Sequence, residues 1–465
     1  MLFTSYVIAA AAMIAAALYL ILRLRLFVTT TTMLVGSLLL IYGPAALSFT
    51  LSSGQFGFLI RPLLGNIRVF SSMFPLIKEK IGDIDPVIIS LNFSLALMYV
   101  GVIVGIELVG RLFFARATLT DAAVAKWSGE PVRDEQHGHL ILLIAISVLF
   151  LFMLFVSVRE NHLGTIQHFY SIKGDNDARD AYRAHFADSP SYVYRVLLSA
   201  VAPMLVIWGF LAGTLRRRWP LVLAAVLLFL VAIIGKIELL SKAPPAFFLI
   251  QIALAGMLTF TNRISWRATV AGALVVSLLI YTATRLIVIL PEGASFIETV
   301  YSRVFEMENE TLVENFAVFP ALHPFMWGAN IRPIAILTGV PYVPSYGLVG
   351  YIWHNTHVIT SPTLFIADAW TDFSYVGVFV YSIIAGAICR GIDLTFLARG
   401  KSVVAIAVLS ATFLGLFTLL TTALNTALFS GGLLLAPILA VILMTTMRML
   451  SGPRVPLGKP GPPPF

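Results

Sequence analysis

Eleven mostly apolar runs, many of them about 20 residues long, constrain the fold of this chain more than any other feature. Because an α-helix rises about 1.5 Å per residue, about 20 such residues cross the hydrocarbon core of a bilayer. The runs lie near residues 5–22, 28–51, 87–113, 139–157, 193–214, 220–235, 243–261, 268–290, 372–391, 402–424 and 430–447. They predict an all-α polytopic membrane protein with about 11 transmembrane helices.

The composition agrees with a membrane protein. Charged residues make up 12% of the chain and hydrophobic residues 59%, whereas about 25% of a typical soluble domain is charged. The net charge of +8 fits basic cytoplasmic loops, and the sequence carries no motif that reads nucleic acid. The single cysteine, Cys389, allows no intrachain disulfide, and we interpret it as an apolar filler of the core.

Basic residues predict the orientation of the helices. The first apolar run has no basic residue before it and is followed by Arg23 and Arg25. A later short loop on the same predicted side holds Arg216, Arg217 and Arg218. Because Lys and Arg accumulate in cytoplasmic loops, we expect the N-terminus outside and the C-terminus in the cytoplasm. The tail at 451–465 is rich in Pro and Gly and is expected to be a disordered cytoplasmic segment.

Three longer segments, 52–86, 158–192 and 291–371, are then predicted outside. The last, between predicted helices eight and nine, is far longer than an ordinary connection, and such loops are usually functional or disordered. It is rich in aromatic residues, among them Trp353 and Trp370. We therefore predict that 291–371 is a large folded external cap, which belongs to a single transmembrane domain of residues 1–450.

Several cations are predicted at one depth, near the outer ends of helices. Arg285 lies toward the outer end of an apolar run, Lys242 precedes another run, and Lys236 and Arg195 lie at further helix ends. Charged groups at such positions mark binding sites or pathways, so the four could converge on an anion. Snorkelling into the interface and anchoring to lipid headgroups are the alternatives.

The predicted cap carries candidates for acid–base chemistry. Glu314 precedes Asn315-Phe316-Ala317 and is the acidic residue of its segment that we expect to turn inward. His354 and His357 are three residues apart and can share a helix face. No paired carboxylates or cysteines stand nearby, so we favour a general base over a metal ligand.

Two further patterns have a structural and a functional interpretation. Asp83-Ile84-Asp85-Pro86 contains the D-x-D pair with which some glycosyltransferases hold a metal, but we favour the start of the third helix. Ser361 before Pro362 favours a helix N-cap, because proline is common at the first helical position.

Short motifs give the chain a resemblance to the oligosaccharide repeat-unit polymerases (O-antigen and common-antigen polymerases, Wzy type). The motifs are Tyr194-Arg195 with Ala202-Pro203-Met204-Leu205, Leu240-Ser241-Lys242-Ala243, Glu314-Asn315-Phe316-Ala317, Thr360-Ser361-Pro362-Thr363-Leu364, Tyr375-Val376-Gly377-Val378-Phe379 and Ile383-Ile384-Ala385-Gly386. The likeness in layout covers most of the chain. It departs from the family at Lys242, where an arginine is frequent.

The resemblance implies a reaction on the periplasmic face of the bacterial inner (plasma) membrane. A growing glycan leaves undecaprenyl diphosphate and joins the terminal sugar of another lipid-linked oligosaccharide, and a chain-length regulator and a flippase are possible partners. Positive charge on the departing oxygens suffices for such a leaving group, so no metal or other cofactor is expected. The candidates for diphosphate binding are Arg285, Lys242, Arg195, Arg303 and Arg332. The candidate bases are His357, His354 and Glu314.

Two other classes of function stay open at this point. A ligase, or another transferase of lipid-linked glycans, would use the same chemistry. A polysaccharide transporter or flippase would be expected to carry polar groups near the membrane midplane, whereas the polar groups here are predicted near the outer interface.

Overall fold

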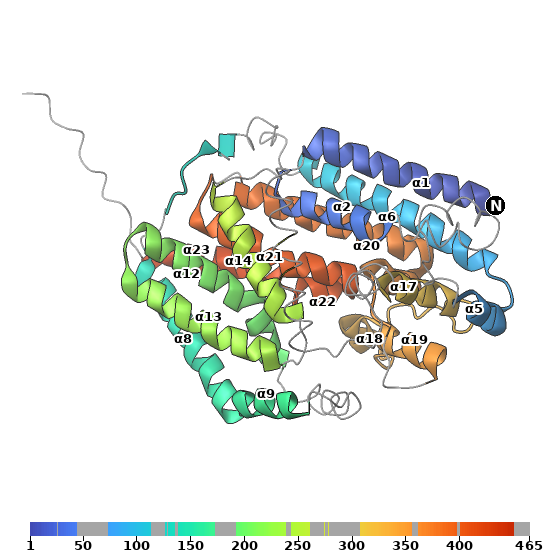
Figure 1. Cartoon of the computed structure of the whole chain (residues 1–465). Helices are drawn as coiled ribbons and strands as arrows, with labels where there is room; N and C mark the ends of the chain where they lie inside the picture. Colours follow the sequence, from blue (N-terminus) through green and yellow to red (C-terminus); the bar gives the residue numbers. More distant parts are fainter. Residues whose placement is uncertain are drawn as a thin grey trace, which may run out of the picture.

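The chain is described by a computed structural model. The residues that it describes are 1–25, 27–43, 73–112, 126–127, 129–134, 138–172, 192–238, 243–260, 274, 278, 307–355, 361–397 and 400–450. Helices make up most of this part of the chain, which contains no strand but has isolated β-bridges, one of them between Arg133 and Ser402 (Figure 1). The predicted all-α class is therefore confirmed for these residues.

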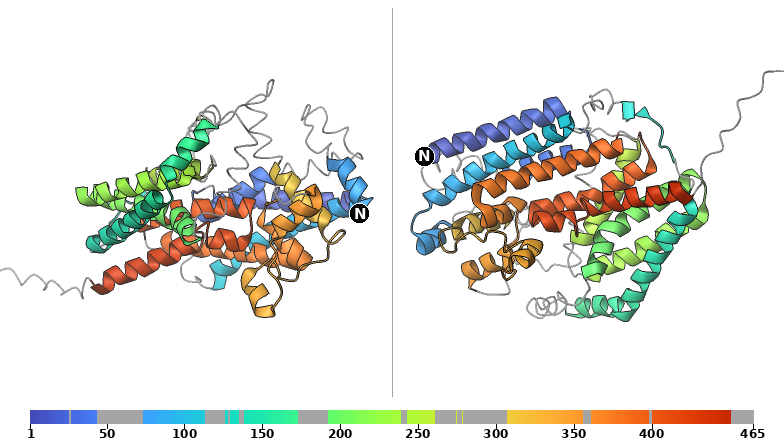
Figure 2. Two further views of the ribbon diagram at one scale, coloured as in Figure 1. Left: turned by 90° about the horizontal axis from the view of Figure 1, so that it is seen from below. Right: turned by 180° about the vertical axis from the view of Figure 1, so that it is seen from behind.

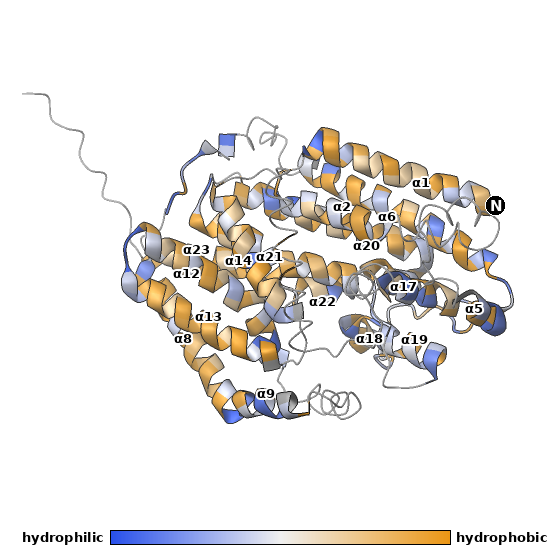
Figure 3. Cartoon of the chain, in the orientation of Figure 1, coloured by the Kyte–Doolittle hydropathy of each residue, from blue (hydrophilic) through white to orange (hydrophobic). Residues whose placement is uncertain are grey.

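In the described part of the chain, seven helices are long and apolar enough to cross a membrane. They are α1 with the π-helical turn that continues it (Leu2–Leu24), α6 (Asp85–Leu112), α8 (His139–Arg159), the stretch from α11 to α12 (Tyr192–Leu215), α13 (Trp219–Glu238), α20 (Phe365–Leu397) and α21 (Val403–Thr421). Shorter apolar helices are α2 (Thr30–Ile41), α14 (Ala243–Phe260) and α23 (Leu435–Leu450). Apolar residues cover these helices in Figure 3.

These helices make the chain a multi-pass membrane protein, and each overlaps one of the predicted runs. The start predicted at 372 was wrong, because α20 begins at Phe365, within the predicted cap. Residues 44–51 of the second run lie outside the described part of the chain, and one run has no described helix. That run is 268–290, of which only residues 274 and 278 belong to the described part of the chain. The count of 11 transmembrane helices therefore stays a prediction.

Helices α6 and α20 pack closely because glycines remove side chains from their contact. Gly101 and Gly105 stand four residues apart on α6 and face α20. A Cβ on Gly105 would lie 2.1 Å from the carbonyl oxygen of Ile383, and a Cβ on Gly386 would lie 2.3 Å from that of Val102. Small residues with this spacing let membrane helices approach one another, and here they bring a helix near the N-terminus against one near the C-terminus.

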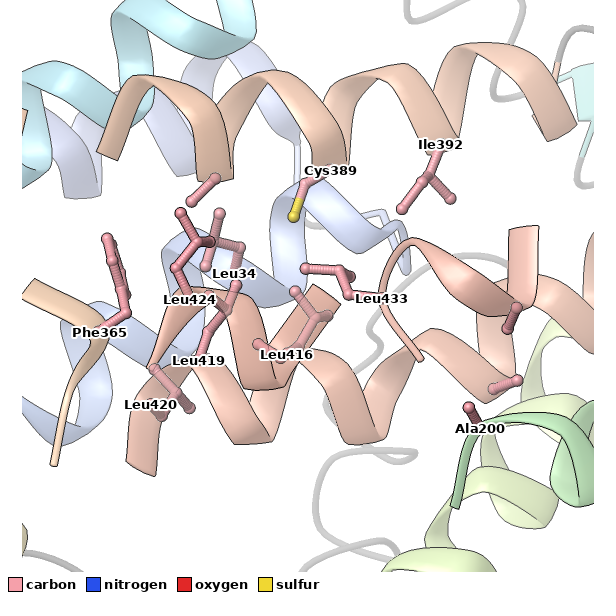
Figure 4. Packing of buried hydrophobic residues seen from close by; sticks show 14 of the residues in the cluster. Leu34, Ala200, Phe365, Cys389, Ile392, Leu416, Leu419, Leu420, Leu424 and Leu433 are labelled. Carbon is pink, nitrogen blue, oxygen red and sulfur yellow. The ribbon is translucent and has the colours of Figure 1, made fainter. Parts of the chain in front are cut away.

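The core beside this pair is apolar. Cys389 is fully buried, and in Figure 4 its side chain points from α20 into a layer of leucines from α2 and α21, among them Leu34 and Leu416. The interpretation of Cys389 as a core filler is confirmed.

Loops predicted on the cytoplasmic side contact one another. The backbone N–H of Arg133 donates to the carbonyl of Lys401 at 2.8 Å. The Nε of Arg216 lies 3.2 Å from the carboxylate Oδ2 of Asp134. Because these residues come from three different predicted internal loops, the contacts support the predicted order of crossings. Which end of the bundle faces the cytoplasm stays a prediction.

Two of the segments predicted on the external side meet at the other end. Helix α5 (Met73–Ile81), in the first of them, contacts α17 (Met307–Val318) and the end of α19 (Ser345–His354) from the predicted cap, which also contains α18 (Arg332–Thr338). Figure 1 shows these four helices gathered near the start of α1, and Figure 2 shows the same grouping from behind. The second segment contributes α9 (His162–Ser171) next to α13. The described part of 291–371 therefore forms helices, whereas its external position stays a prediction.

Helix α6 begins at Asp85, whose backbone N–H donates to the carboxylate of Asp83 at 3.1 Å. The interpretation of the D-x-D sequence as a helix start is confirmed, because Asp83 satisfies one of the amides that a helix leaves without an internal partner.

A sharp kink divides α20 where it meets the cap. Phe373 and Ser374 leave the helical conformation, with Ser374 at φ 56°. The kink frees the carbonyls of Thr371 and Asp372, which accept from the backbone N–H groups of Met326 at 2.9 Å and Trp327 at 3.1 Å. Helix kinks persist where other groups satisfy the released backbone, so the cap and the broken helix stabilise each other.

Candidate functional site

A carboxylate and an imidazole meet between the cap and the membrane helices. Glu314 lies on α17, on a face that buries Val313 and Ala317, and its side chain is only 6% exposed. Its Oε1 lies 3.3 Å from Nε2 of His354, the last residue of α19. Its Oε2 accepts from the hydroxyl of Ser361. Glu314 therefore turns inward, as predicted, and two candidate bases form one pair.

Aromatic and backbone contacts fix the position of α17. The ring of Phe316 stacks on that of Trp370 in α20 at 4.7 Å between centroids, and the indole N–H of Trp370 donates to the carbonyl of Phe319 at 3.1 Å. The amide of Asn315 donates to the carbonyl of Ser361 at 3.4 Å. These contacts lock the helix that carries Glu314 to the part of α20 that precedes its kink.

Lys80 is a cation of this site, and it comes from the first of the segments predicted to be external. Its ammonium group donates to the carbonyls of Ile352 at 3.1 Å and Trp353 at 2.8 Å. It also lies 5.3 Å from the centre of the Trp353 ring, within the range of a cation–π contact. Lys80 thus holds the end of α19, directly before His354.

The environment disfavours the charged form of both titrating groups. Burial raises the pKa of Glu314 to about 7, against the opposing effects of the Ser361 hydrogen bond and of Lys80. Burial and the charge of Lys80 lower the pKa of His354. The pair is therefore better described as a hydrogen bond between groups that are neutral or share one proton than as a permanent ion pair.

A second acidic residue of α17 is also protonated more readily than usual. Burial raises the pKa of Glu308 to about 8, although a hydrogen bond with Tyr42 opposes the shift. Thr363 donates to the carbonyl of Glu308 at 2.7 Å. Glu308 therefore carries a proton at neutral pH, while Glu314 exchanges one.

A small pocket, lined mainly by residues with hydroxyl or amide side chains, lies next to the pair. Hydroxyl and amide groups line it from the cap, namely those of Asn315, Ser345, Tyr346, Ser361 and Thr363. Thr422 and Ala423, which precede the short helix α22 (Leu424–Leu428), line it from the membrane bundle. Ser361 and Asn315 connect this pocket to Glu314.

A hydrogen-bond network at the start of α20 supports the pocket. Asp368 accepts from the hydroxyl of Ser345 and, at 2.9 Å, from the side-chain amide of Asn330. Asp372 accepts from the backbone N–H of Gly328 at 3.0 Å. These contacts tie the loop after α17 and the first turn of α19 to the kinked helix.

The predicted cations are dispersed or lie outside the described residues. Arg195 is half-buried on α11 (Tyr192–Val196), which belongs to the α12 side of the bundle. Arg332 is exposed at the start of α18, where its charge acts on Tyr342. Arg285, Lys242, Arg303 and His357 lie outside the described residues. The predicted convergence of Arg285, Lys242 and Arg195 therefore stays a prediction.

Sequence reasoning missed Lys80 and misread Ser361. Lys80 stands in Lys78-Glu79-Lys80, which resembles any solvated charged segment, and nothing in the sequence places it beside α19. Ser361 and Pro362 do not begin a helix, since α20 begins at Phe365. That prediction was wrong because the hydroxyl of Ser361 is bound to Glu314 and its N–H to the carbonyl of Tyr346.

No protein-family model, no curated protein and no solved structure matches the chain. Membership of the repeat-unit polymerases therefore stays a prediction from the short motifs. Two of these motifs do meet in space, because Ser361 in one donates its hydroxyl hydrogen to Glu314 in the other.

Proposed function

We propose that this protein polymerises undecaprenyl-diphosphate-linked oligosaccharide repeat units into a cell-surface polysaccharide, on the periplasmic face of the bacterial inner membrane. The observation that carries the proposal is the buried Glu314–His354 pair beside a hydroxyl-lined pocket, at the end of the bundle predicted to be external. A site on that side meets sugars that are already attached to a membrane lipid. Lipid-linked glycan is therefore the substrate class that fits.

The pair supplies the base that the reaction needs. Glu314, with a pKa of about 7, accepts the proton of the attacking sugar hydroxyl near neutral pH, where a base of matched pKa works best. The hydroxyl oxygen forms the new glycosidic bond to the anomeric carbon of the donor. The bond from that carbon to the diphosphate oxygen breaks, and undecaprenyl diphosphate leaves with the electron pair. His354 relays the proton from Glu314 toward solvent.

Cations stabilise the departing diphosphate. Among the described residues, Lys80 is a cation whose charge acts on both Glu314 and His354, and Arg332 belongs to the cap. Arg285, Lys242, Arg195 and Arg303 are the further candidates from the sequence. Fixed positive charges aimed at developing negative charge lower the barrier without any change in the protein at the moment of reaction.

A deletion strain tests the proposal through the length profile of its surface glycan. We expect single repeat units to accumulate on the lipid at the outer face, and the wild-type gene to restore long polymer. Accumulation on the cytoplasmic leaflet would instead identify a flippase. Accumulation of finished polymer on the lipid would identify a ligase.

Matched variants connect the profile to the site. Glu314→Gln keeps the shape of the side chain but removes the base, so we expect the glycan to stop at one repeat unit. Glu79→Gln changes an exposed carboxylate on α5, near Lys80 but outside the pair, and should leave the glycan unchanged. Normal polymer from Glu314→Gln at normal protein levels would remove Glu314 from the chemistry.

A further inference from the structure

The cap carries an apolar surface that no described part of the chain covers. On α18, the side chains of Ile336 and Leu337 are 72% and 85% exposed. Trp327, in the turn before α18, is 70% exposed. Val340 and Tyr342, which follow α18, are also exposed. We call these five residues the α18 surface. Contiguous apolar residues on a polar domain mark an interaction site.

The edge of this surface continues into the lipid-facing side of α20. The ring of Trp327 packs edge-on against Phe373 at 6.4 Å between centroids, and Phe373 lies at the kink of α20. Directly beyond the kink, Val376, Val380 and Ile384 follow one another at intervals of four residues, and all are exposed. Because α20 is apolar enough to cross a membrane, this stripe faces acyl chains.

We propose that the partner of the α18 surface is the bilayer itself, and that α18 lies in the membrane interface at the cap end of the bundle. Tryptophan side chains favour the level of the lipid headgroups, and Trp327 would lie at that level in this arrangement. Ile336 and Leu337 insert among the upper acyl chains. Arg332, exposed at the start of the same helix, then meets the negatively charged lipid phosphates.

Continuity and charge together favour lipid over a protein partner. Through the contact between Trp327 and Phe373, the α18 surface adjoins the end of the lipid-facing stripe of α20. The adjacent charge is positive, as a phospholipid surface requires. This arrangement would also hold the cap at the depth where a lipid diphosphate lies, but it does not depend on the proposed reaction.

The test uses an environment-sensitive fluorophore attached to a single introduced cysteine. The native Cys389 is fully buried, so the unmodified protein serves as the labelling blank. Leu337→Cys probes the α18 surface, Glu79→Cys provides an exposed site on α5, and Val380→Cys provides a lipid-facing site on α20. Each protein is reconstituted in phosphatidylcholine–phosphatidylglycerol vesicles and quenched with aqueous iodide or with lipids spin-labelled near the headgroup.

We expect the label at Leu337 to behave like that at Val380. Iodide should quench it several-fold less than the label at Glu79, and the spin-labelled lipids should quench it several-fold more. Iodide quenching equal to that at Glu79 would overturn the proposal. Protection from both quenchers would also overturn it, because it would mean that protein covers the surface.

A second measurement avoids any cysteine on the cap. Trp327 is itself a fluorophore, so the difference between the native protein and Trp327→Phe isolates its emission. Brominated lipids should quench that difference signal. A Trp327 contribution that brominated lipids leave unquenched while iodide removes it would place the residue in water and contradict the proposal.

Discussion

The substitution Glu314→Gln should have opposite effects on stability and on activity. In the folded protein Glu314 is buried and its pKa is raised from 4.5 to about 7. The folded state therefore holds the proton more tightly than the unfolded chain does between pH 4.5 and about 7. Stability falls as the pH rises through that window and is constant above it.

The size of the effect follows from the shift. A shift of one pKa unit corresponds to about 1.4 kcal/mol, so ionised Glu314 costs the fold about 3 kcal/mol at pH 8. Glutamine is uncharged at every pH. Its oxygen can still accept from Ser361, and its amide can donate to Nε2 of neutral His354. Glu314→Gln should therefore stabilise the protein at pH 8 and change little at pH 4.5.

Thermal unfolding in detergent, followed by tryptophan fluorescence at a series of pH values, measures this effect. The melting temperature of Glu314→Gln should exceed that of the native protein at pH 8, and the two curves should converge toward pH 4.5. Polymer synthesis by the variant should be lost at all pH values. Greater destabilisation at pH 8 than at pH 4.5 would refute the reasoning, because it would mean that an ionised Glu314 pairs with a charged His354.

Three further predictions follow from single contacts. Lys80→Met removes a charge that lowers the pKa of both Glu314 and His354, so the acid limb of the pH–activity profile should move to higher pH. Lys80→Arg keeps the charge and should leave the limb where it is in the native protein; an acid limb that does not move in Lys80→Met would contradict this. Gly105→Ala should destabilise the fold by about 2 kcal/mol through overpacking against α20, whereas Gly110→Ala, with no neighbour within 4 Å, should not; equal melting temperatures would contradict this. Asp393→Ala should lower the free energy of unfolding by about 3 kcal/mol, because buried N–H groups of α2 lose their acceptor, and Asp393→Asn should lower it less. An unchanged melting temperature would mean that Asp393 does not cap the N-terminus of α2.

The N-terminal cap of α2 explains the last of these predictions. The carboxylate of Asp393 accepts from the backbone N–H groups of Thr30 at 2.8 Å and Thr31 at 2.9 Å. Both threonines are buried, so water cannot replace the lost acceptor. The carboxylate that caps α2 thus comes from a helix far away in sequence, since Thr30 and Asp393 are 363 positions apart.

The transmembrane helices could be predicted from the sequence because hydrophobicity is a local signal. An apolar run is visible in any window of about 20 residues, and the apolar helices that the structure describes overlap the predicted runs. The inward turn of Glu314 was also predictable, since the apolar residues after it mark a buried helix face.

The partners within the site could not be predicted, because they come from distant segments. Lys80 reaches α19 across 272 residues, and Ser361 reaches Glu314 across 47. Neither pairing follows from spacing or periodicity. The kink of α20 at Ser374 is equally unpredictable from the sequence, since it depends on backbone N–H groups of the cap that donate to the carbonyls of Thr371 and Asp372.

The most direct test of the central claim measures release of the leaving group. Purified protein in vesicles is given the lipid-linked repeat unit isolated from the deletion strain, and free undecaprenyl diphosphate is quantified together with polymer. We expect the native protein and Glu79→Gln to release it in step with polymer growth, and Glu314→Gln to release none. Equal release from Glu314→Gln, or polymer growth without release, would contradict the assignment of the Glu314–His354 pair as the catalytic base.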